Sequence, residues 1–218
     1  MNDTSWTRDA RALLDQAAAR HGGWSRWERV DEIRGRLYDL GGAIPWAKGL
    51  GNTFASPEHV IVRPREWRAF FDGVERPPLA HRESFRGWRK WRRWRQEDAA
   101  YFFGCAISTY WSLPFVLART SLLAHDPRRR TLTVEFPAEL DSHCRRQRFW
   151  FADDGLLVRH DYHAEIVSTT ARGAHVSAGY VEAGGLWFAT ERRVYVRLGR
   201  LALPMVVLRA RFADLAVT

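Results

Sequence analysis

Residues 143–167, HCRRQRFWFADDGLLVRHDYHAEIV, decide the fold of this 218-residue chain. Two runs of strand-forming residues flank Asp153-Asp154-Gly155, a tripeptide typical of a three-residue hairpin loop. Asp begins such a turn and Gly takes its left-handed position. The sequence therefore predicts a β-hairpin in which Ala152 lies opposite Leu156.

This register, continued along both strands, divides the polar side chains between two faces. On one face it predicts the pairs His143–Glu165, Arg145–His163 and Gln147–Asp161. Residues directly opposite each other interact across strands, and a carboxylate beside an imidazole raises the pKa of the histidine. Such a row could supply a general acid, a general base and a group that stabilises an anion. We therefore predict five catalytic residues: His143, Arg145, Asp161, His163 and Glu165.

The other face of the hairpin is a competing site, and the sequence leaves open which face lines a cavity and which faces solvent. It would carry the pairs Cys144–Ala164, Arg146–Tyr162, Arg148–His160 and Trp150–Val158. His160 and Tyr162 would lie about 7 Å apart on one strand face, close enough to act on one small ligand. The predicted ligand-binding residues, including aromatic residues elsewhere in the chain, are Gln147, Trp46, Tyr101, Tyr110, Trp111, Trp150, His160 and Tyr162.

Metal and cofactor sites have little support in the sequence. His160 and His163 would lie on opposite faces of a strand, so HDYH is a poor metal motif. Two cysteines are too few for a zinc site or a disulfide framework. The glycine-rich residues 41–51 lack the spacing of a phosphate-binding loop. We expect no metal and no cofactor.

The composition is that of an ordinary globular protein, with 46% hydrophobic and 27% charged residues. The chain has a formal charge of +9, which comes from arginine because Lys48 and Lys90 are its lysines. Its first residues are polar and acidic, unlike a signal peptide. No apolar run reaches the length of about 18 residues that a membrane span needs. These features predict a cytoplasmic protein.

Residues 84–112 are predicted to form an inserted helix that ends before Pro114. Trp88, Trp91 and Trp94 follow one another at intervals of three, among six basic residues. Such a segment could bind nucleic acid or an anionic membrane. Alternatively, its arginine stems cover the surface while its indole rings cover the core, an interpretation that the short basic cluster favours. We therefore expect no specific nucleic-acid partner and at most a weak contact with anionic membranes.

The remaining pattern predicts one α+β domain over residues 1–218. An amphipathic helix is expected over residues 5–21, capped between Asp3 and Ser5. Short strands follow around residues 30–40, 59–63 and 67–71, and residues 131–213 alternate as antiparallel strands. A sheet of about 9–11 strands must curl. We expect a strongly curved half-barrel whose concave face is covered by the N-terminal helix and the inserted Trp-rich helix.

This order of elements resembles the unclosed β-barrel of lipoprotein carriers of the LolA/LppX type, a fold shared by a cofactor-free enzyme of the violacein pathway. The resemblance rests on the N-terminal helix, the lead-in Trp24, Trp27, Val30, the mid-chain helix and the long C-terminal strands. Residues 184–196, GGLWFATERRVYV, are similar to the G-L-x-x-P-T-x-R strand of such proteins, with Ala189 where proline is usual. The resemblance implies a curved sheet that holds an elongated apolar ligand, and it implies no shared catalytic residue.

Two functions of different class follow as hypotheses, and the sequence does not determine the oligomeric state. The first is a cofactor-independent enzyme of specialised metabolism, which would cyclise, isomerise or rearrange an apolar or aromatic intermediate by acid–base catalysis. The second is a non-catalytic carrier of a lipid-like ligand. Nucleic-acid binding through the Trp/Arg segment is a weaker third. The absence of an export signal favours the enzyme over the carrier.

Overall fold

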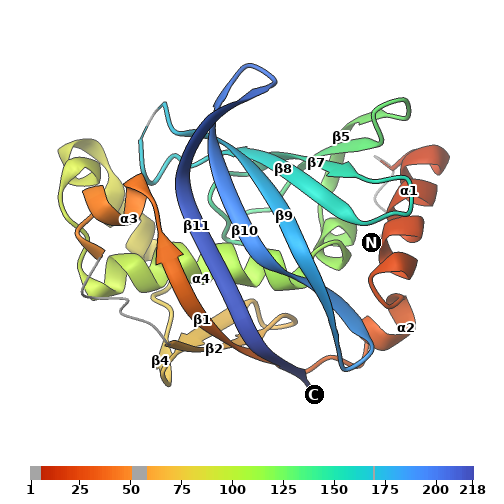
Figure 1. Cartoon of the computed structure of the whole chain (residues 1–218), viewed down its shortest axis with the longest axis horizontal. Helices are drawn as coiled ribbons and strands as arrows, with labels where there is room; N and C mark the ends of the chain where they lie inside the picture. The colour runs from red at the N-terminus through yellow and green to blue at the C-terminus, as the bar shows by residue number, and fades with distance from the viewer. Residues whose placement is uncertain (1–5, 51–57, 169) are drawn as a thin grey trace.

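The computed structural model describes residues 6–50, 58–168 and 170–218 of the chain. Its strands form one antiparallel sheet of eleven strands, in the order β4-β3-β2-β1-β11-β10-β9-β8-β7-β6-β5 (Figure 1). The two edge strands, β4 and β5, do not pair, so the sheet is unclosed. These features confirm the predicted α+β class and the half-barrel of 9–11 antiparallel strands.

After β6, each strand is longer than the one before it. Their bounds are β1 Ile33–Gly41, β2 Glu58–Arg63, β3 Arg68–Phe71, β4 Val74–Glu75, β5 Ser121–Asp126, β6 Thr131–Glu135, β7 Arg146–Phe151, β8 Leu157–His163, β9 Arg172–Ala183, β10 Leu186–Leu198 and β11 Leu201–Val217. β1 pairs with β11 near the middle of the sheet, where Ile33 lies opposite Val217.

The helices are few. They are α1 Arg8–Arg20, α2 Trp24–Trp27, α3 Ala43–Ala47 and α4 Gln96–Ser112, together with the 3₁₀ helices η2 Leu79–Phe85, η3 Gly87–Trp91 and η4 Phe115–Arg119. α1 confirms the expected N-terminal helix, and the Thr7 hydroxyl caps it by accepting a hydrogen bond from the Ala10 amide. The cap expected between Asp3 and Ser5 lies outside the described residues. No helix in the described ranges is both long and apolar enough to cross a membrane.

The predicted helix over residues 84–112 is wrong in its first third. The tryptophan-rich residues lie in η2, η3 and the turns around them, where Gly87 has a φ of +60°. The helix α4 begins at Gln96 because the Asp98 carboxylate accepts a hydrogen bond from the Arg95 amide and so caps it. Trp88 and Trp91 are exposed, whereas Trp94 is buried.

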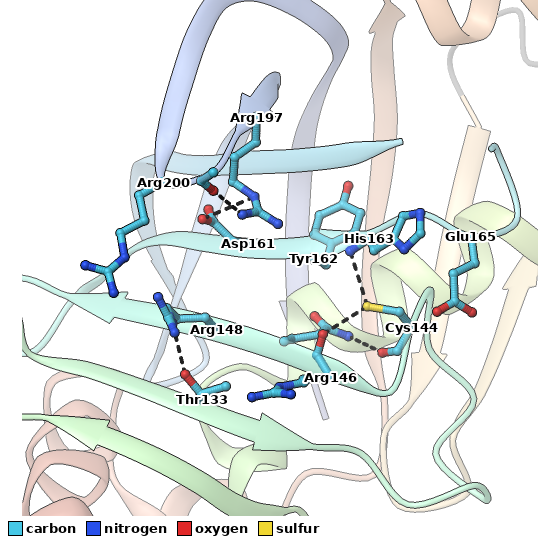
Figure 2. Close-up of a pocket in the computed structure, with 12 residues that line it drawn as sticks. Thr133, Cys144, Arg146, Arg148, Asp161, Tyr162, His163, Glu165, Arg197 and Arg200 are labelled. Carbon is cyan, nitrogen blue, oxygen red and sulfur yellow. Dashed lines mark hydrogen bonds and ion pairs between the residues drawn. The ribbon is translucent and has the colours of Figure 1, made fainter. Parts of the chain in front are cut away.

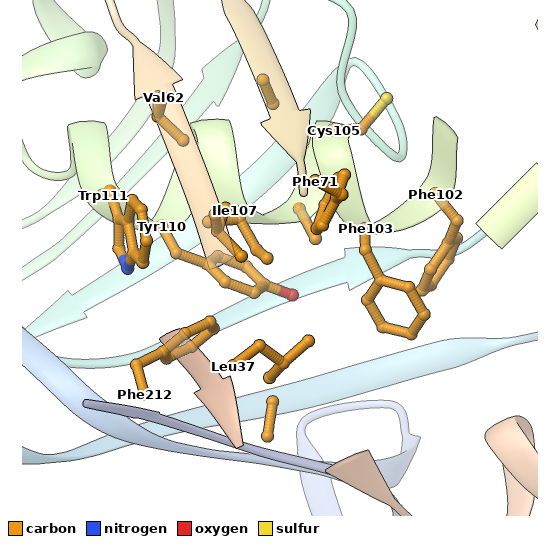
Figure 3. Packing of buried hydrophobic residues seen from close by; sticks show 14 of the residues in the cluster. Leu37, Val62, Phe71, Phe102, Phe103, Cys105, Ile107, Tyr110, Trp111 and Phe212 are labelled. Atoms are coloured by element: carbon orange, nitrogen blue, oxygen red, sulfur yellow. The ribbon is translucent and has the colours of Figure 1, made fainter. Parts of the chain in front are cut away.

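α4 fills the concave face of the sheet (Figure 1), and its residues from Asp98 to Ser112 are all buried. A helix that is apolar on all sides needs cover on all sides, and the curved sheet provides it. Figure 3 shows Ile107, Tyr110 and Trp111 of α4 packed against side chains of the strands. The Trp111 ring meets that of Phe212 edge-on at 5.5 Å.

The hairpin turn forms as predicted, but the register beyond it is different. The Ala152 amide donates to the Leu156 carbonyl at 2.8 Å, and Gly155 has a φ of +92°. Next to the turn, Phe151 lies opposite Leu157, but Trp150 lies opposite Arg159, so Val158 is the extra residue of a β-bulge.

Because of the bulge, every residue of β8 after Val158 lies on the face opposite to the one that the sequence predicted. Phe149 lies opposite His160 and Arg148 opposite Asp161, where the ladder between β7 and β8 ends. The predicted pairs Gln147–Asp161, Arg148–His160 and Trp150–Val158 are therefore wrong. The predicted pairs His143–Glu165, Arg145–His163, Cys144–Ala164 and Arg146–Tyr162 are not part of this ladder either.

Candidate functional site

The hairpin separates the predicted site residues into two groups. Gln147, His160 and Tyr162 are buried beneath the concave face, with His143 of the preceding loop. Asp161 and His163 belong to the convex face. Arg145 and Glu165 are exposed; they pair with Glu135 and Arg82, respectively. Asp161, His163 and Glu165 line one depression on the convex face, whereas His143 and Arg145 do not line it, so the five predicted catalytic residues do not form one site.

The concave group forms a cluster of rings, defined by Tyr110, His143, His160, Tyr162 and His175 and called here the Tyr–His cluster. The His160 ring stacks on those of Phe149 at 5.4 Å and Tyr162 at 5.0 Å. The His175 ring, from β9, lies 4.5 Å from that of His160. Tyr110 of α4 covers His175 edge-on at 4.6 Å. The helix α4, the loop before β7 and the strands β8 and β9 thus build one cluster.

His143 is a neutral structural member of this cluster. Its Nε2 lies 3.0 Å from the Phe102 carbonyl oxygen, and its ring stacks on that of Phe102 at 4.2 Å. Burial lowers the pKa of His143 to about 4. The prediction of a carboxylate opposite His143, raising its pKa, is therefore wrong.

His160 and His175 are also kept neutral. Burial lowers the pKa of each imidazole well below 6.5. In the described part of the chain, both ring nitrogens of His175 and the Nδ1 of His160 lack a hydrogen-bond partner. Buried polar atoms are nearly always paired, so these three nitrogens mark the cluster as unusual.

Arg192 of β10 adds a buried positive charge to the cluster. It is 2% exposed, donates to the Ser177 hydroxyl at 2.9 Å and to the Tyr110 carbonyl at 3.3 Å, and lies 4.7 Å over the Tyr110 ring. No carboxylate of the described residues pairs with it. Burial lowers the pKa of its guanidinium. Neither Arg192 nor His175 was predicted as a site residue, because alternation along a strand does not show which distant helix covers it.

The two tyrosines of the cluster influence each other's pKa. Burial raises the pKa of Tyr110 to about 12 and that of Tyr162 well above 10; the neighbouring Tyr110 raises the pKa of Tyr162 further, whereas Tyr162 lowers that of Tyr110. Both phenols therefore stay protonated at neutral pH. They can donate a hydrogen bond or a proton, but they are poor bases.

A mostly apolar pocket of about 280 Å³ opens beside the Tyr–His cluster, and we call it the concave pocket. It lies between α3, α4, the β8–β9 loop and the strands β10 and β11. Among its lining residues are Ile44, Phe102, Tyr162, Val194, Val196 and Leu208. Tyr162 is the member of the cluster that lines it.

The other predicted ligand-binding residues lie elsewhere. Tyr101 and Trp111 are buried in the core around α4. Trp46 is 84% exposed on α3 and does not line the concave pocket. Trp150 is half-buried on the convex face, where Arg159 lies over its ring at 4.9 Å. Gln147 uses its amide nitrogen to hold the Cys144 carbonyl at 3.0 Å.

A second, polar depression of about 470 Å³ lies on the convex face, and we call it the convex hollow. Figure 2 shows its lining, which includes Thr133, Arg146, Arg148, Asp161, Arg197 and Arg200. The Asp161 carboxylate accepts two hydrogen bonds from Arg159, at 2.7 and 2.9 Å, and lies 3.4 Å from Arg197. The predicted base Asp161 is therefore part of an ion-pair network.

Within the described ranges, no three histidine, cysteine, aspartate or glutamate side chains come together in a way that could hold a metal ion. Cys105 and Cys144 are both buried and unbonded to each other. Burial raises the pKa of the Cys105 thiol to about 12 and that of Cys144 to about 11. Neither thiol is ionised at neutral pH, which argues against a cysteine nucleophile.

Comparison with known proteins gives a likeness in fold. The chain matches no protein-family model and no curated protein. It is similar to the crystal structure of a DUF1329 family protein from Desulfovibrio piger, with 11% identity and a TM-score of 0.46, over 97% of this chain and 94% of that one. Such a TM-score says nothing about a shared ligand or activity. The unclosed antiparallel sheet agrees with the resemblance to LolA/LppX carriers, and membership of that family stays a prediction.

Proposed function

We propose that the protein binds an apolar or aromatic small molecule in the concave pocket and presents the Tyr162 hydroxyl to it. The observation that carries this proposal is the position of Tyr162, which both lines the pocket and belongs to the Tyr–His cluster. Ligand sites typically combine apolar walls with a few fixed polar groups, and this pocket has that composition.

The dimensions of the pocket indicate the class of ligand. Its volume of about 280 Å³ is at the lower end of small-molecule sites. Phe102 and the aliphatic side chains of β10 and β11 suit one or two fused rings or a short hydrocarbon better than a long lipid.

The finer proposal is catalysis without a cofactor. A phenol that stays protonated at neutral pH can donate to a carbonyl oxygen and stabilise the negative charge that develops there. The neighbouring Tyr110 raises the pKa of Tyr162 further and so helps to keep its hydroxyl protonated. Polarisation of the carbonyl group would assist an isomerisation or cyclisation through an enol, in which the proton that leaves carbon passes to solvent water, because both phenols are poor bases. The neutral imidazoles of His160 and His175 add no charge beside Tyr162.

The second candidate function is that of a carrier, which the aliphatic lining of the concave pocket favours. A carrier would bind its ligand in the same pocket without using the Tyr162 hydroxyl.

The first experiment is native mass spectrometry, with organic extraction, of the protein purified from its own host. A retained small apolar molecule is the expected result. Binding of the fluorescent probe 1-anilinonaphthalene-8-sulfonate provides a second readout.

Val196→Trp tests the location by filling the pocket with an indole. We expect it to weaken probe binding about tenfold or more and to remove the retained molecule. Val181→Trp is the matched control, because Val181 is 41% exposed on β9 and does not line the pocket. Equal binding by both variants would exclude the concave pocket.

Tyr162→Phe separates the enzyme from the carrier, since it removes one hydroxyl and keeps the ring. If the protein is an enzyme, the variant retains an unconverted molecule that differs in mass or chromatographic behaviour from the one retained by the wild type. A carrier retains the same molecule with and without the hydroxyl.

A further inference from the structure

We propose that the convex hollow is a second binding site, which takes the dianionic phosphate group of a small phosphate monoester. The convex hollow opens on the other face of the sheet from the concave pocket, although Tyr162 contributes to the lining of both, and the proposal does not depend on what that pocket binds.

The first argument is charge. Four arginines line the hollow, Arg146, Arg148, Arg197 and Arg200, and they face the carboxylates of Asp161 and Glu165. Both carboxylates already have partners, because Asp161 accepts hydrogen bonds from Arg159 and Glu165 pairs with Arg82. In the described part of the chain, the guanidinium groups of Arg146, Arg148 and Arg200 pair with no carboxylate. The hollow therefore has an excess of positive charge, which suits a dianion.

The second argument is preorganisation. The Arg148 Nε donates to the Thr133 hydroxyl at 2.9 Å, which leaves its two terminal nitrogens directed elsewhere. Arg197 of β10 is held by Asp161 of β8, across the intervening strand β9. Figure 2 shows Arg146, Arg148, Arg197 and Arg200 around one depression. Side chains fixed before binding lose less entropy when they bind, and the planar guanidinium fork matches phosphate oxygens.

The third argument is space. The convex hollow has a volume of about 470 Å³, and an adjoining depression of about 280 Å³ shares Thr133, Arg148 and Arg200 with it. The adjoining depression is also lined by Trp150. A phosphate in the first depression therefore leaves room for the organic part of an ester in the second. This bounded shape fits a small molecule better than an extended polyanion.

Calorimetric titration with phenyl phosphate tests the proposal, with inorganic phosphate as the probe without an organic part. We expect the wild type to bind phenyl phosphate with a Kd below about 1 mM and more tightly than inorganic phosphate. Arg148→Ala and Arg197→Gln are each expected to weaken binding about tenfold or more, because each removes a charge-assisted hydrogen bond.

Arg193→Ala is the matched control. Arg193 lies on the same strand and face as Arg197, is exposed and pairs with Glu191, but it does not line the hollow. We expect it to leave binding unchanged. Circular dichroism checks that each variant is folded.

Three results would overturn the proposal. The first is no binding of either phosphate by the wild type. The second is that Arg193→Ala weakens the binding of phenyl phosphate as much as Arg148→Ala and Arg197→Gln do. A single-stranded oligonucleotide that binds more tightly than phenyl phosphate, and whose binding all three variants weaken equally, has the same meaning, because either result describes a generally basic surface. The third is loss of phenyl phosphate binding in Val196→Trp, which would place the anion in the concave pocket.

Discussion

On the concave face of β8, His160 and Tyr162 lie among aromatic rings, whereas the residue between them, Asp161, lies among arginines on the convex face. Burial lowers the pKa of His160 well below 6.5 and raises that of Tyr162, so both side chains are uncharged at neutral pH. On the convex face, Asp161 is also buried, but it lies against the guanidinium groups of Arg159 and Arg197. The comparison shows that consecutive residues of one strand can be buried in an uncharged aromatic cluster on one face and in an ion-pair network on the other.

Acid should destabilise the Tyr–His cluster first, with the largest effect. Burial lowers the pKa of His143 to about 4 and those of His160 and His175 well below 6.5, and it lowers that of His21, the buried residue that ends α1, to about 4. Below pH 6.5 the unfolded chain binds protons that the folded chain does not, so stability falls as the pH falls. Between pH 7.5 and 5, the ordinary pKa of 6.5 in the unfolded chain limits the loss in the free energy of unfolding to about 2 kcal/mol per histidine, or at most about 8 kcal/mol for the four together. Urea unfolding across this range measures it.

His175→Leu should reduce this pH dependence by about one quarter, because the variant has one fewer buried imidazole. The exposed His59 provides the control, and His59→Asn should leave the pH dependence unchanged. A free energy of unfolding that stays constant from pH 7.5 to pH 5 would contradict the neutral, buried state of the Tyr–His cluster.

Two adjacent residues of β7 test, at constant pH, whether the concave face contributes more to stability than the convex face. Phe149 is fully buried on the concave face, and Trp150 is half-buried on the convex face beneath Arg148 and Arg159. Phe149→Ala should cost about 3–5 kcal/mol through the cavity it leaves. Trp150→Ala should cost only about 1 kcal/mol, mainly in cation–π contacts. Urea unfolding of both variants provides the test, and equal costs would mean that the two faces are packed alike.

The smallest effect is expected from removing the bulge. Val158 is the extra residue of β8 and is 38% exposed. Its deletion keeps Leu157, His160 and Tyr162 on the concave face. We expect deletion of Val158 to cost less than about 1 kcal/mol, since the remaining ladder becomes regular. Deletion of Trp150, on the strand without a bulge, should cost several times more because it reverses the faces of β7. Thermal unfolding compares them, and similar losses for both deletions would be evidence against this description of the bulge.

The sequence predicted features that depend on neighbouring residues and missed those that depend on distant ones. The turn at Asp153-Asp154-Gly155 formed as expected because its chemistry lies within three residues. The bulge at Val158 was missed because the register of β8 also depends on β9, where Arg159 pairs with Val176. β5 was missed because its short, mixed sequence shows no alternation.

The tryptophan-rich segment was misassigned for a different reason. A spacing of three between Trp88 and Trp91 matches the period of a 3₁₀ helix better than that of an α-helix. Gly87 and the cap at Asp98 then separate this segment from α4. Of the Tyr–His cluster, Tyr110, His143, His160 and Tyr162 were predicted as site residues, although not which face of the hairpin held His160 and Tyr162. His175 and Arg192 could not be assigned because their neighbours come from α4, far away along the chain.

The pairing of β1 with β11 has a consequence for how the chain is made. Among the strands of this sheet, β11 leaves the ribosome last, yet it lies between β1 and β10. Until residues 201–217 emerge, the nascent chain can form only two halves of this sheet, β4 to β1 and β10 to β5, each with an open edge. This high contact order predicts folding on the slow, millisecond-to-second timescale. Those two open edges are where a nascent chain would be prone to aggregate.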